Sequence, residues 1–225
     1  MTLLAAKLKF ELKEESHMEI SLDDAYSLKS PAENRALYAK WARTYESEFV
    51  INEGYEHPKV ISELFDNLTP QVRSVIDIGT GTGLVGHYLH QLRPKILIDG
   101  VDISPEMLAE ARKKGVYRNL YERDLTEPIK GMDAPYDALI CIGIFTHGHL
   151  GPEVLANLIP IIRSGGYFVI GINAKFFKSE NFEAKFEELH EVALITKPIF
   201  QEIKVYKEGS AHENSLNVVA IFQKS

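Results

Sequence analysis

Short apolar runs alternate with segments of helical periodicity between Ser74 and Gln223, and this alternation constrains the fold more than any other feature of the chain. Such a β–α–β–α order is typical of a parallel sheet with helices packed on its faces. The sequence therefore predicts an α/β protein. We expect seven strands, at Ser74–Ile78, Ile96–Asp102, Asn119–Glu122, Tyr136–Ile142, Tyr167–Ile172, Phe200–Glu208 and Leu216–Gln223.

The last two predicted strands must pair in opposite directions. Only the seven residues Gly209–Ser215 separate them. A parallel return needs a crossover of a dozen or more residues, whereas an antiparallel return needs only a short turn. We therefore expect a mostly parallel sheet that ends in an antiparallel pair.

The clearest helix start precedes the sheet. Ser30 can cap a helix whose first residue is Pro31, and Glu33 completes a capping box. We expect this helix to run to about Glu46 and a second one to run from Pro58 towards Leu68. The first helix carries one apolar and aromatic face, formed by Leu37, Tyr38, Trp41, Ala42 and Tyr45.

Further helices are expected at Leu84–Leu92, after the Ser104 cap with Pro105 in the first turn, and from Pro152 onward. Residues 1–30 show no sustained periodicity, and we expect them to form a partly ordered extension. Residues 31–225 then form a single domain, which includes the N-terminal helices within residues 31–68. A chain of this length can build one large core.

Charge and cysteine content exclude several classes of protein. The formal charge is −7, and no long Lys/Arg run is present, so we do not expect nucleic acid as the main partner. The single Cys141 cannot form an intramolecular disulfide or a cysteine zinc site, and we expect a buried thiol. The first residues do not resemble a secretory signal, and no apolar run reaches the roughly 20 residues of a membrane span. We expect a cytoplasmic protein that does not insert into membranes.

The strongest local signal is a strand that leads directly into a glycine-rich turn and then a helix, at Val75–Gly83. Glycines let backbone approach a ligand closely, and the following helix start offers free N–H groups. The same segment contains the literal dinucleotide pattern Gly81-x-Gly83-x-x-Gly86. The glycines alone therefore do not separate a dinucleotide site from a site for another adenosine cofactor.

Three acidic residues narrow this choice. Asp102 ends the second strand, 21 residues after Gly81, where it can accept both hydroxyls of an adenosine ribose. Asp124 follows the third strand and could accept from the adenine amine, or else form a surface pair with Arg123. Asp77 precedes the turn, near the expected place of a cationic amino-acid group. A dinucleotide site requires neither Asp77 nor Asp124.

These residues, with the Arg163–Gly166 turn and the antiparallel final pair, resemble a class I S-adenosylmethionine-dependent methyltransferase. The motifs around Ala25–Leu28, Pro31–Glu46 and Thr146–His149 resemble, more narrowly, the methyltransferase-like family of the Williams–Beuren chromosomal region. That family usually has Asp where this chain has Glu46. The resemblance implies a Rossmann-like sheet with helices on both faces and an N-terminal helical lid.

The resemblance also implies a set of cofactor-binding residues for S-adenosylmethionine. The turn would hold the methionine part, Asp102 the ribose, and Asp124 with Leu125 the adenine. Three aromatic residues would close the lid, although the same face could simply pack on the core. The implied positions are Tyr38, Trp41, Tyr45, Asp77, Gly79, Thr80, Gly81, Gly83, Asp102, Ile103, Met107, Asp124 and Leu125.

Two histidine arrangements remain to be placed. His147 follows the fourth strand, whose carboxyl end opens on the ligand crevice of such a sheet, so we expect it in the acceptor site, as a loop-ordering residue, a cofactor contact or a general base. His87 and His90 lie on one helix without an evident third ligand, and we expect no metal.

The sequence thus predicts an enzyme that transfers a methyl group in line from S-adenosylmethionine to a small molecule. The fourth strand ends in Gly143–Thr146 and lacks the Asn/Asp-Pro-Pro-aromatic signature of nucleobase amino methylation. Two alternatives stay open. One is an NAD-type oxidoreductase, and the other is a non-catalytic module that binds S-adenosylmethionine.

Overall fold

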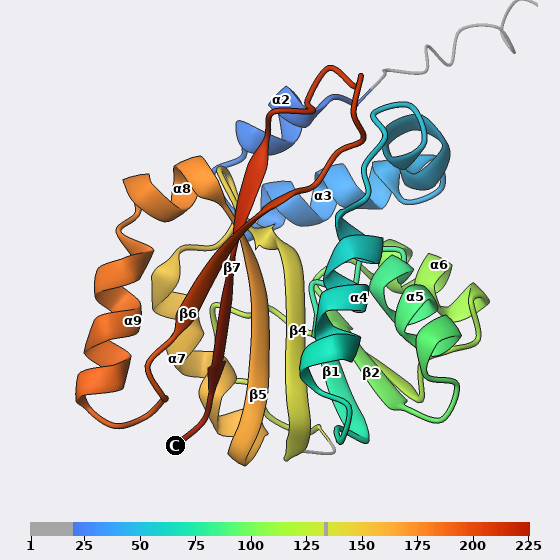
Figure 1. The fold of residues 1–225 in the computed structure, drawn as a ribbon. Helices are drawn as coiled ribbons and strands as arrows, with labels where there is room; N and C mark the ends of the chain where they lie inside the picture. The colour runs from blue at the N-terminus through green and yellow to red at the C-terminus, as the bar shows by residue number, and fades with distance from the viewer. Residues whose placement is uncertain (1–19, 133–134) are drawn as a thin grey trace, which may run out of the picture.

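The computed structural model describes residues 20–132 and 135–225. Within these residues, seven strands form one sheet in the order β3-β2-β1-β4-β5-β7-β6 (Figure 1). Strand β7 runs antiparallel to both of its neighbours, and the other paired strands are parallel. The predicted fold class is confirmed. The strands are β1 (Ser74–Ile78), β2 (Leu97–Asp102), β3 (Asn119–Glu122), β4 (Tyr136–Phe145), β5 (Ile162–Asn173), β6 (Ile199–Lys204) and β7 (Leu216–Gln223).

Strands β4 and β6 end at other residues than the sequence predicts. Strand β4 continues to Phe145, because Gly143 with a φ of 78° permits an irregularity in its pairing with β5. Strand β6 ends at Lys204, four residues early. There the chain turns to the N-terminal helices, where Val205 O accepts from the Glu56 N–H and Tyr206 forms an isolated bridge with Tyr55.

The predicted N-terminal helix is divided in two. Helix α3 (Pro31–Trp41) begins as expected, with the Ser30 hydroxyl accepting from the Glu33 N–H. After a turn the chain continues as a π-helix, η1 (Tyr45–Val50), instead of a continuous α-helix to Glu46. The other main helices are α4 (His57–Leu68), α5 (Leu84–Leu92), α6 (Pro105–Lys113), α8 (Ala174–Ser179) and α9 (Phe182–Glu191).

The segment that opens at Pro152 is also broken. It forms three short pieces, η2 (Pro152–Val154), α7 (Leu155–Leu158) and η3 (Ile159–Ile161). Pro160 lies in the last piece, and a proline cannot donate the backbone hydrogen bond that would extend the α-helix. Its apolar residues are nevertheless buried, as the sequence pattern predicts.

Two apolar clusters cover the two faces of the sheet. One joins the sheet to α4 and α5, through residues such as Phe65 and Leu89. The other joins the opposite face to α7 and α9, through residues such as Leu158 and Phe186. Cys141 is buried in this second cluster, as expected. The helices therefore leave the strand ends, not the faces, available for a site.

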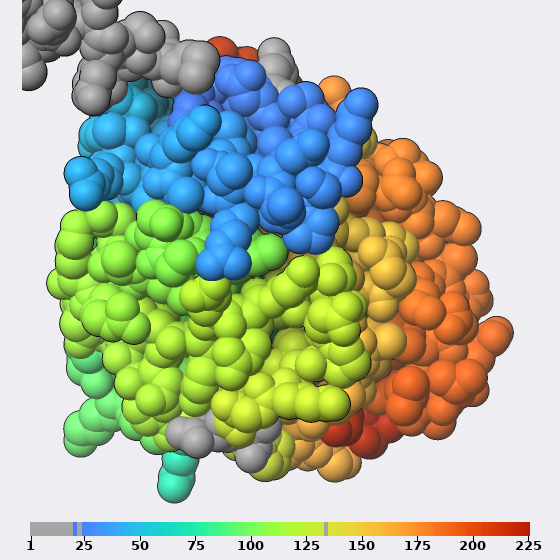
Figure 2. Space-filling view, turned by 180° about the vertical axis from the view of Figure 1, so that it is seen from behind, coloured from blue at the N-terminus to red at the C-terminus, as the bar shows by residue number. Residues whose placement is uncertain are grey.

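The N-terminal helices lie across the carboxyl ends of the parallel strands (Figure 1). Seen from the opposite side, the first described residues rest against the segment around α6 and β3 (Figure 2). Two ion pairs cross this contact: Arg35 with Glu122, and Glu46 with Lys114. Most of the predicted extension lies outside the described residues, but α2 (Leu22–Tyr26) belongs to it, and its last residues lie against Gly148 in the loop after β4. None of the described helices is both long and apolar enough to span a membrane.

Candidate active site

Three glycines shape the turn that leaves β1. Gly79, Gly81 and Gly83 have positive φ angles of 75°, 53° and 86°. A Cβ atom on Gly79 would lie 2.3 Å from Ile144 Cγ2, and one on Gly83 would lie 2.9 Å from the Tyr117 ring. Neither the backbone angle nor the space permits a side chain at these two positions. The turn therefore exposes bare backbone where β1 ends and α5 begins.

This turn lines a cavity of about 310 Å³. The cavity lies where the strand order reverses between β1 and β4, which is the usual place for a ligand in an open α/β sheet. The N-terminal helices supply another part of its wall. Of the cofactor residues predicted from the sequence, the wall contains Tyr38, Tyr45, Gly79, Thr80, Gly81, Asp102, Ile103, Met107, Asp124 and Leu125.

Asp102 ends β2 beside the turn. Its Oδ2 accepts a hydrogen bond from the Gly81 N–H at 2.8 Å, and its Oδ1 accepts one from the Ser104 N–H at 2.9 Å. Burial raises the pKa of Asp102, and the backbone hydrogen bonds from Ser104 and Gly81 oppose this effect. Each carboxylate oxygen has two lone pairs. Asp102 therefore fixes the turn and retains the capacity to accept from a ligand hydroxyl.

Asp124 lies just beyond β3 in the same wall. Its Oδ1 accepts from the backbone N–H and the hydroxyl of Thr126, at 2.9 Å and 2.7 Å. The Arg123 guanidinium donates to the backbone carbonyls of Glu122 and Lys130. These contacts differ from the Arg123–Asp124 surface pair that the sequence left open. They hold Asp124 in a local turn at the cavity.

Asp77 lies beneath the turn and does not line the cavity. Its Oδ2 accepts from the Tyr117 hydroxyl at 2.6 Å, and this hydroxyl accepts from the Gly86 N–H at 3.0 Å. Burial raises the pKa of Asp77 to about 7, the Tyr117 hydrogen bond opposes the rise, and the charge of Asp102 adds to it. The structure makes Asp77 an anchor for the start of α5, and its expected place near a cationic ligand group stays a prediction. Gly83 likewise lies outside the cavity wall, and it packs against Tyr117.

The aromatic face of the N-terminal helices both packs and lines the cavity. Trp41 is 1% exposed, stacks on Tyr38 with ring centroids 6.0 Å apart, and meets the Tyr45 ring edge-on at 5.1 Å. Tyr38 and Tyr45 belong to the cavity wall, but Trp41 does not. The face can therefore both pack on the core and form part of a lid over the cavity.

The two histidines after β4 have separate places. His147 is absent from the cavity wall, and its ring lies against Tyr26 and Phe176, with centroids 6.1 Å and 5.0 Å away. His149 lines the cavity, with Nε2 2.9 Å from the Tyr38 hydroxyl and Nδ1 3.0 Å from the His147 carbonyl. A carbonyl only accepts, so we assign the proton to Nδ1, and Nε2 accepts from Tyr38. Burial lowers the pKa of His149, and the contact with the His147 carbonyl opposes this effect.

Several wall residues escaped the sequence prediction. Leu28 and Lys29 lie in the segment that we expected to be an extension. Asn34 donates from Nδ2 to the Gly148 carbonyl at 2.9 Å and links α3 to the loop after β4. Its position in the motif Pro31–Asn34 was the available signal, as was the position of His149 in Thr146–His149.

The described residues contain no group of three or more His, Cys, Asp or Glu side chains that could hold a metal ion. His87 contacts the Gln91 side chain at 3.0 Å on the surface of α5. The charged residues in the cavity wall are Lys29, Asp102, Arg123, Asp124 and Glu153. This wall suits a polar cofactor that carries charges of both signs.

Comparisons with known proteins agree with this architecture. A structure of the 1,6-didemethyltoxoflavin-N1-methyltransferase of Burkholderia thailandensis superposes with a TM-score of 0.60, at 19% identity, over 88% of this chain and 92% of that one. A structure of the plantazolicin methyltransferase BpumL gives a TM-score of 0.60, at 12% identity, over 91% and 95%. The chain thus shares the fold of these methyltransferase structures.

The sequence match is narrower than the fold match. Residues 75–166, less than half of the chain, match the family model described as a methyltransferase domain. Human methyltransferase-like protein 27 is 29% identical over 150 residues, which are 63% of this chain and 58% of that protein. The chain therefore matches less than two thirds of the length of this relative.

Proposed function

We propose that this chain transfers the methyl group of S-adenosylmethionine directly to a small molecule bound in the same cavity. One observation carries the proposal: a single cavity joins the glycine turn held by Asp102 to the Tyr38–His149 pair. The first element suits the cofactor, and the second suits an acceptor that must lose a proton. The structural neighbours whose names include plantazolicin and didemethyltoxoflavin support a small-molecule acceptor.

The cavity residues fit S-adenosylmethionine. The bare backbone of Gly79 and Gly81 leaves room for the methionine part, and Asp102 can accept from the ribose hydroxyls. Asp124 can accept from the adenine amine, while Ile103 and Met107 offer apolar contacts to the ring. When bound, the cofactor supplies a methyl group on a positively charged sulfur that leaves as a neutral thioether. The remaining steps fall to the side chains of the chain.

Tyr38 and His149 are the residues that we place at the acceptor. The Tyr38 oxygen can accept the proton of an acceptor hydroxyl or amine while Tyr38 gives its own proton to His149 Nε2. The carbonyl of His147 holds the imidazole in the tautomer that this transfer needs. Positioning of the methyl donor and the acceptor in one cavity supplies most of the remaining rate enhancement. His147 itself contributes through the backbone, and a role of its side chain remains a prediction.

The dinucleotide pattern does not support an oxidoreductase. Gly86, its third glycine, is outside the cavity wall, and a Cβ atom there would lie 2.3 Å from Tyr117 Cζ. The position is thus explained by packing on Tyr117, without a pyrophosphate. The other alternative is a non-catalytic module that binds S-adenosylmethionine. A turnover assay excludes it if S-adenosylhomocysteine and the methylated acceptor form in equal amounts.

Isothermal titration tests the cofactor assignment. We expect S-adenosylhomocysteine to bind the full chain and NADH not to bind. Asp102→Ala should weaken S-adenosylhomocysteine binding by roughly 10- to 150-fold, because hydrogen bonds to a charged group contribute about 1.5–3 kcal/mol. Asp66→Ala, which removes a half-buried partner of Arg93 outside the cavity wall, is the matched control. NADH binding without S-adenosylhomocysteine binding, or unchanged affinity in folded Asp102→Ala, would refute the assignment.

A further inference from the structure

A second cavity adjoins the first on the side of the N-terminal helices. Its volume is about 70 Å³, several times the roughly 10–15 Å³ that one water molecule needs. We call it the aromatic annex. Its wall shares five residues with the larger cavity, which makes the two spaces neighbours: Tyr38, Tyr45, Tyr55, Gly143 and His149.

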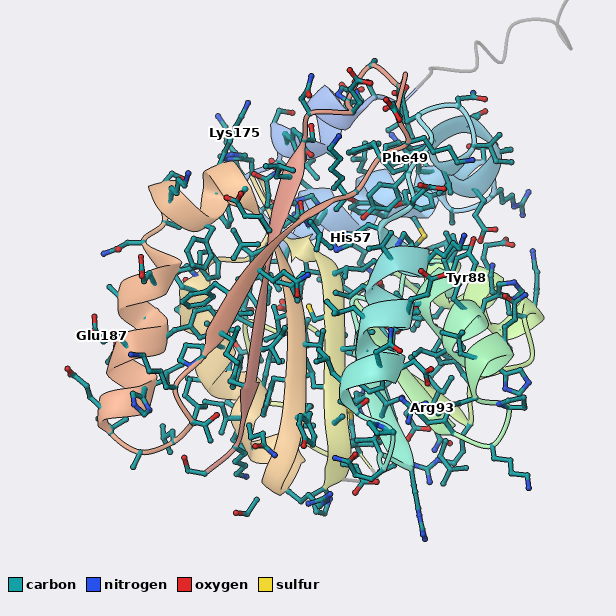
Figure 3. All side chains as sticks on the ribbon, viewed as in Figure 1. Phe49, His57, Tyr88, Arg93, Lys175 and Glu187 are labelled. Carbon is teal, nitrogen blue, oxygen red and sulfur yellow. The ribbon has the colours of Figure 1, made fainter. Side chains whose placement is uncertain are left out.

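Aromatic rings form much of the annex wall. Trp41 and Phe49 come from the N-terminal helices, and Tyr206 comes from the segment after β6. The rings pack on one another: the Phe49–Tyr55 centroids lie 5.1 Å apart, and the Tyr55–Tyr206 centroids lie 5.3 Å apart. Figure 3 shows Phe49 among the N-terminal helices and His57 below it, near the upper end of the sheet. The rings therefore support one another and present preformed flat surfaces.

The annex wall carries no Asp, Glu, Lys or Arg among the residues that the structure describes. The Tyr206 hydroxyl stays protonated because burial raises its pKa, and His149 stays neutral because burial lowers its pKa. An ion that entered would lose its water and find no opposite charge. An uncharged group meets no such penalty. The annex is in this respect unlike the larger cavity.

Two buried polar atoms in the annex residues lack a hydrogen-bond partner within the described structure. They are Trp41 Nε1 and Thr146 Oγ1. Buried polar groups in folded proteins are nearly always paired, so these atoms indicate a missing ligand or water. The indole N–H can only donate. An occupant of the annex that reaches this N–H must therefore offer it a hydrogen-bond acceptor.

We propose that the aromatic annex binds the ring of the methyl acceptor, an uncharged aromatic or heteroaromatic group with a hydrogen-bond acceptor for Trp41. The proposal rests on the proposed function, because Tyr38 and His149 form the wall common to both cavities. A ring in the annex can extend its nucleophilic atom past these two residues towards the transferred methyl group. Tyrosine faces also attract cations, but an unpaired N–H donor favours a neutral acceptor atom.

Trp41 provides the readout, because it is the only tryptophan of the chain. The full chain, saturated with S-adenosylhomocysteine, is titrated with benzamide, benzoate and benzylamine while tryptophan emission is recorded, and ligand-observed NMR confirms binding. We expect benzamide to change the emission saturably. Benzoate and benzylamine should bind at least about 10-fold more weakly, since each would bury an unpaired charge.

Two variants test the two unpaired polar atoms of the annex residues. Trp41→Phe should weaken benzamide binding roughly 2- to 10-fold by NMR, as expected for one neutral hydrogen bond. Thr146→Val gives a second, nearly isosteric test of the unpaired hydroxyl. Tyr88→Phe, on the α5 surface and outside both walls, should change nothing.

The outcomes separate this proposal from the proposed function. Failure to bind S-adenosylhomocysteine overturns the proposed function and this proposal with it. Normal S-adenosylhomocysteine binding without any benzamide response overturns the annex proposal alone. Tighter binding of benzylamine than of benzamide would identify a cation site and reject an uncharged ring. Unchanged benzamide affinity in both Trp41→Phe and Thr146→Val would equally reject it.

Discussion

Two carboxylates, the buried Asp77 and the half-buried Asp102, lie close to one glycine turn, and their partners give them different roles. Asp102 accepts from the Gly81 N–H and faces the cavity, whereas Asp77 accepts from the Tyr117 hydroxyl below it. Two effects raise the cost of ionising Asp77: burial removes water, and the neighbouring Asp102 carries like charge. The difference predicts that Asp102 governs ligand affinity and that Asp77 governs how stability depends on pH.

We expect Asp77→Asn to stabilise the protein increasingly as the pH rises. The pKa of Asp77 is about 7 in the folded chain, above its ordinary value of 3.8, so the folded state holds this proton more tightly. That contribution to stability is complete below about pH 4 and is lost as the pH rises through 7. Asp77→Asn has no carboxyl group at this position, so its stability lacks this loss at high pH. Its free energy of unfolding relative to wild type should rise by up to about 4 kcal/mol between pH 4 and 8, measured by urea denaturation.

Asp137→Asn is the control with the opposite sign. Burial raises the pKa of Asp137, but hydrogen bonds from Arg163 and from the Arg73 and Ser74 amides outweigh it and lower the pKa overall. Its contribution is present above the ordinary pKa and is lost as the pH falls. Asp137→Asn should therefore lose stability relative to wild type at pH 7. A flat profile for Asp77→Asn would show that Asp77 is ionised at no cost.

A second prediction at this scale concerns the protonation of His149. Its Nδ1 lies at the His147 carbonyl and its Nε2 at the Tyr38 hydroxyl, so the neutral ring should be the Nδ1–H tautomer. Burial should keep it neutral below the usual pKa of a histidine. NMR of the chain with ¹⁵N-labelled histidine measures both properties, with His149→Asn to assign the signal and His147→Asn as its pair. An Nε2–H tautomer would remove the proton acceptor that we place beside the methyl acceptor.

At the scale of secondary-structure elements, local signals were sufficient where a few neighbouring residues decide the geometry. Ser30 and Ser104 both cap their helices, accepting from the N–H groups of Glu33 and Met107, as their sequence context predicts. The antiparallel final pair follows equally from a short connection. The glycine turn and Asp102 were predictable for the same reason, because a fixed spacing ties them together.

Other elements depend on contacts that no local pattern reveals. The end of β6 is set by the bridge between Tyr206 and Tyr55, which are far apart in the chain. The π-helix η1 places Phe49 in an apolar cluster that also contains Val205 and Tyr206, from the distant segment after β6. Tyr117 likewise reaches Asp77 from a loop without any motif. Tertiary packing therefore fixes these contacts, whereas the missed wall residues Asn34 and His149 lie in motifs that the sequence already showed.

At the scale of the whole molecule, the N-terminal helices and the sheet act as two parts around one cavity. Their contact includes two ion pairs: Arg35 and Glu122 are both substantially exposed, and Lys114 is largely buried beside the more exposed Glu46. Exposed pairs typically contribute only about 0–1 kcal/mol each. Tyr38 and Tyr45 supply the cavity wall from the helical part, and Asp102 supplies it from the sheet. A ligand in this cavity contacts both parts and should therefore stabilise their contact.

We accordingly expect S-adenosylhomocysteine to slow hydrogen exchange in α3, at Leu37–Trp41, more than elsewhere. If the helix must open before its amides exchange and the open state does not bind, ligand at 100 times its Kd slows exchange by about 100-fold, or about 2.7 kcal/mol. Helix α9, remote from the cavity wall, provides the internal control. Equal exchange with and without ligand would mean that α3 is simply part of the core. Equal slowing of α9 would show that the ligand stabilises the molecule as a single unit.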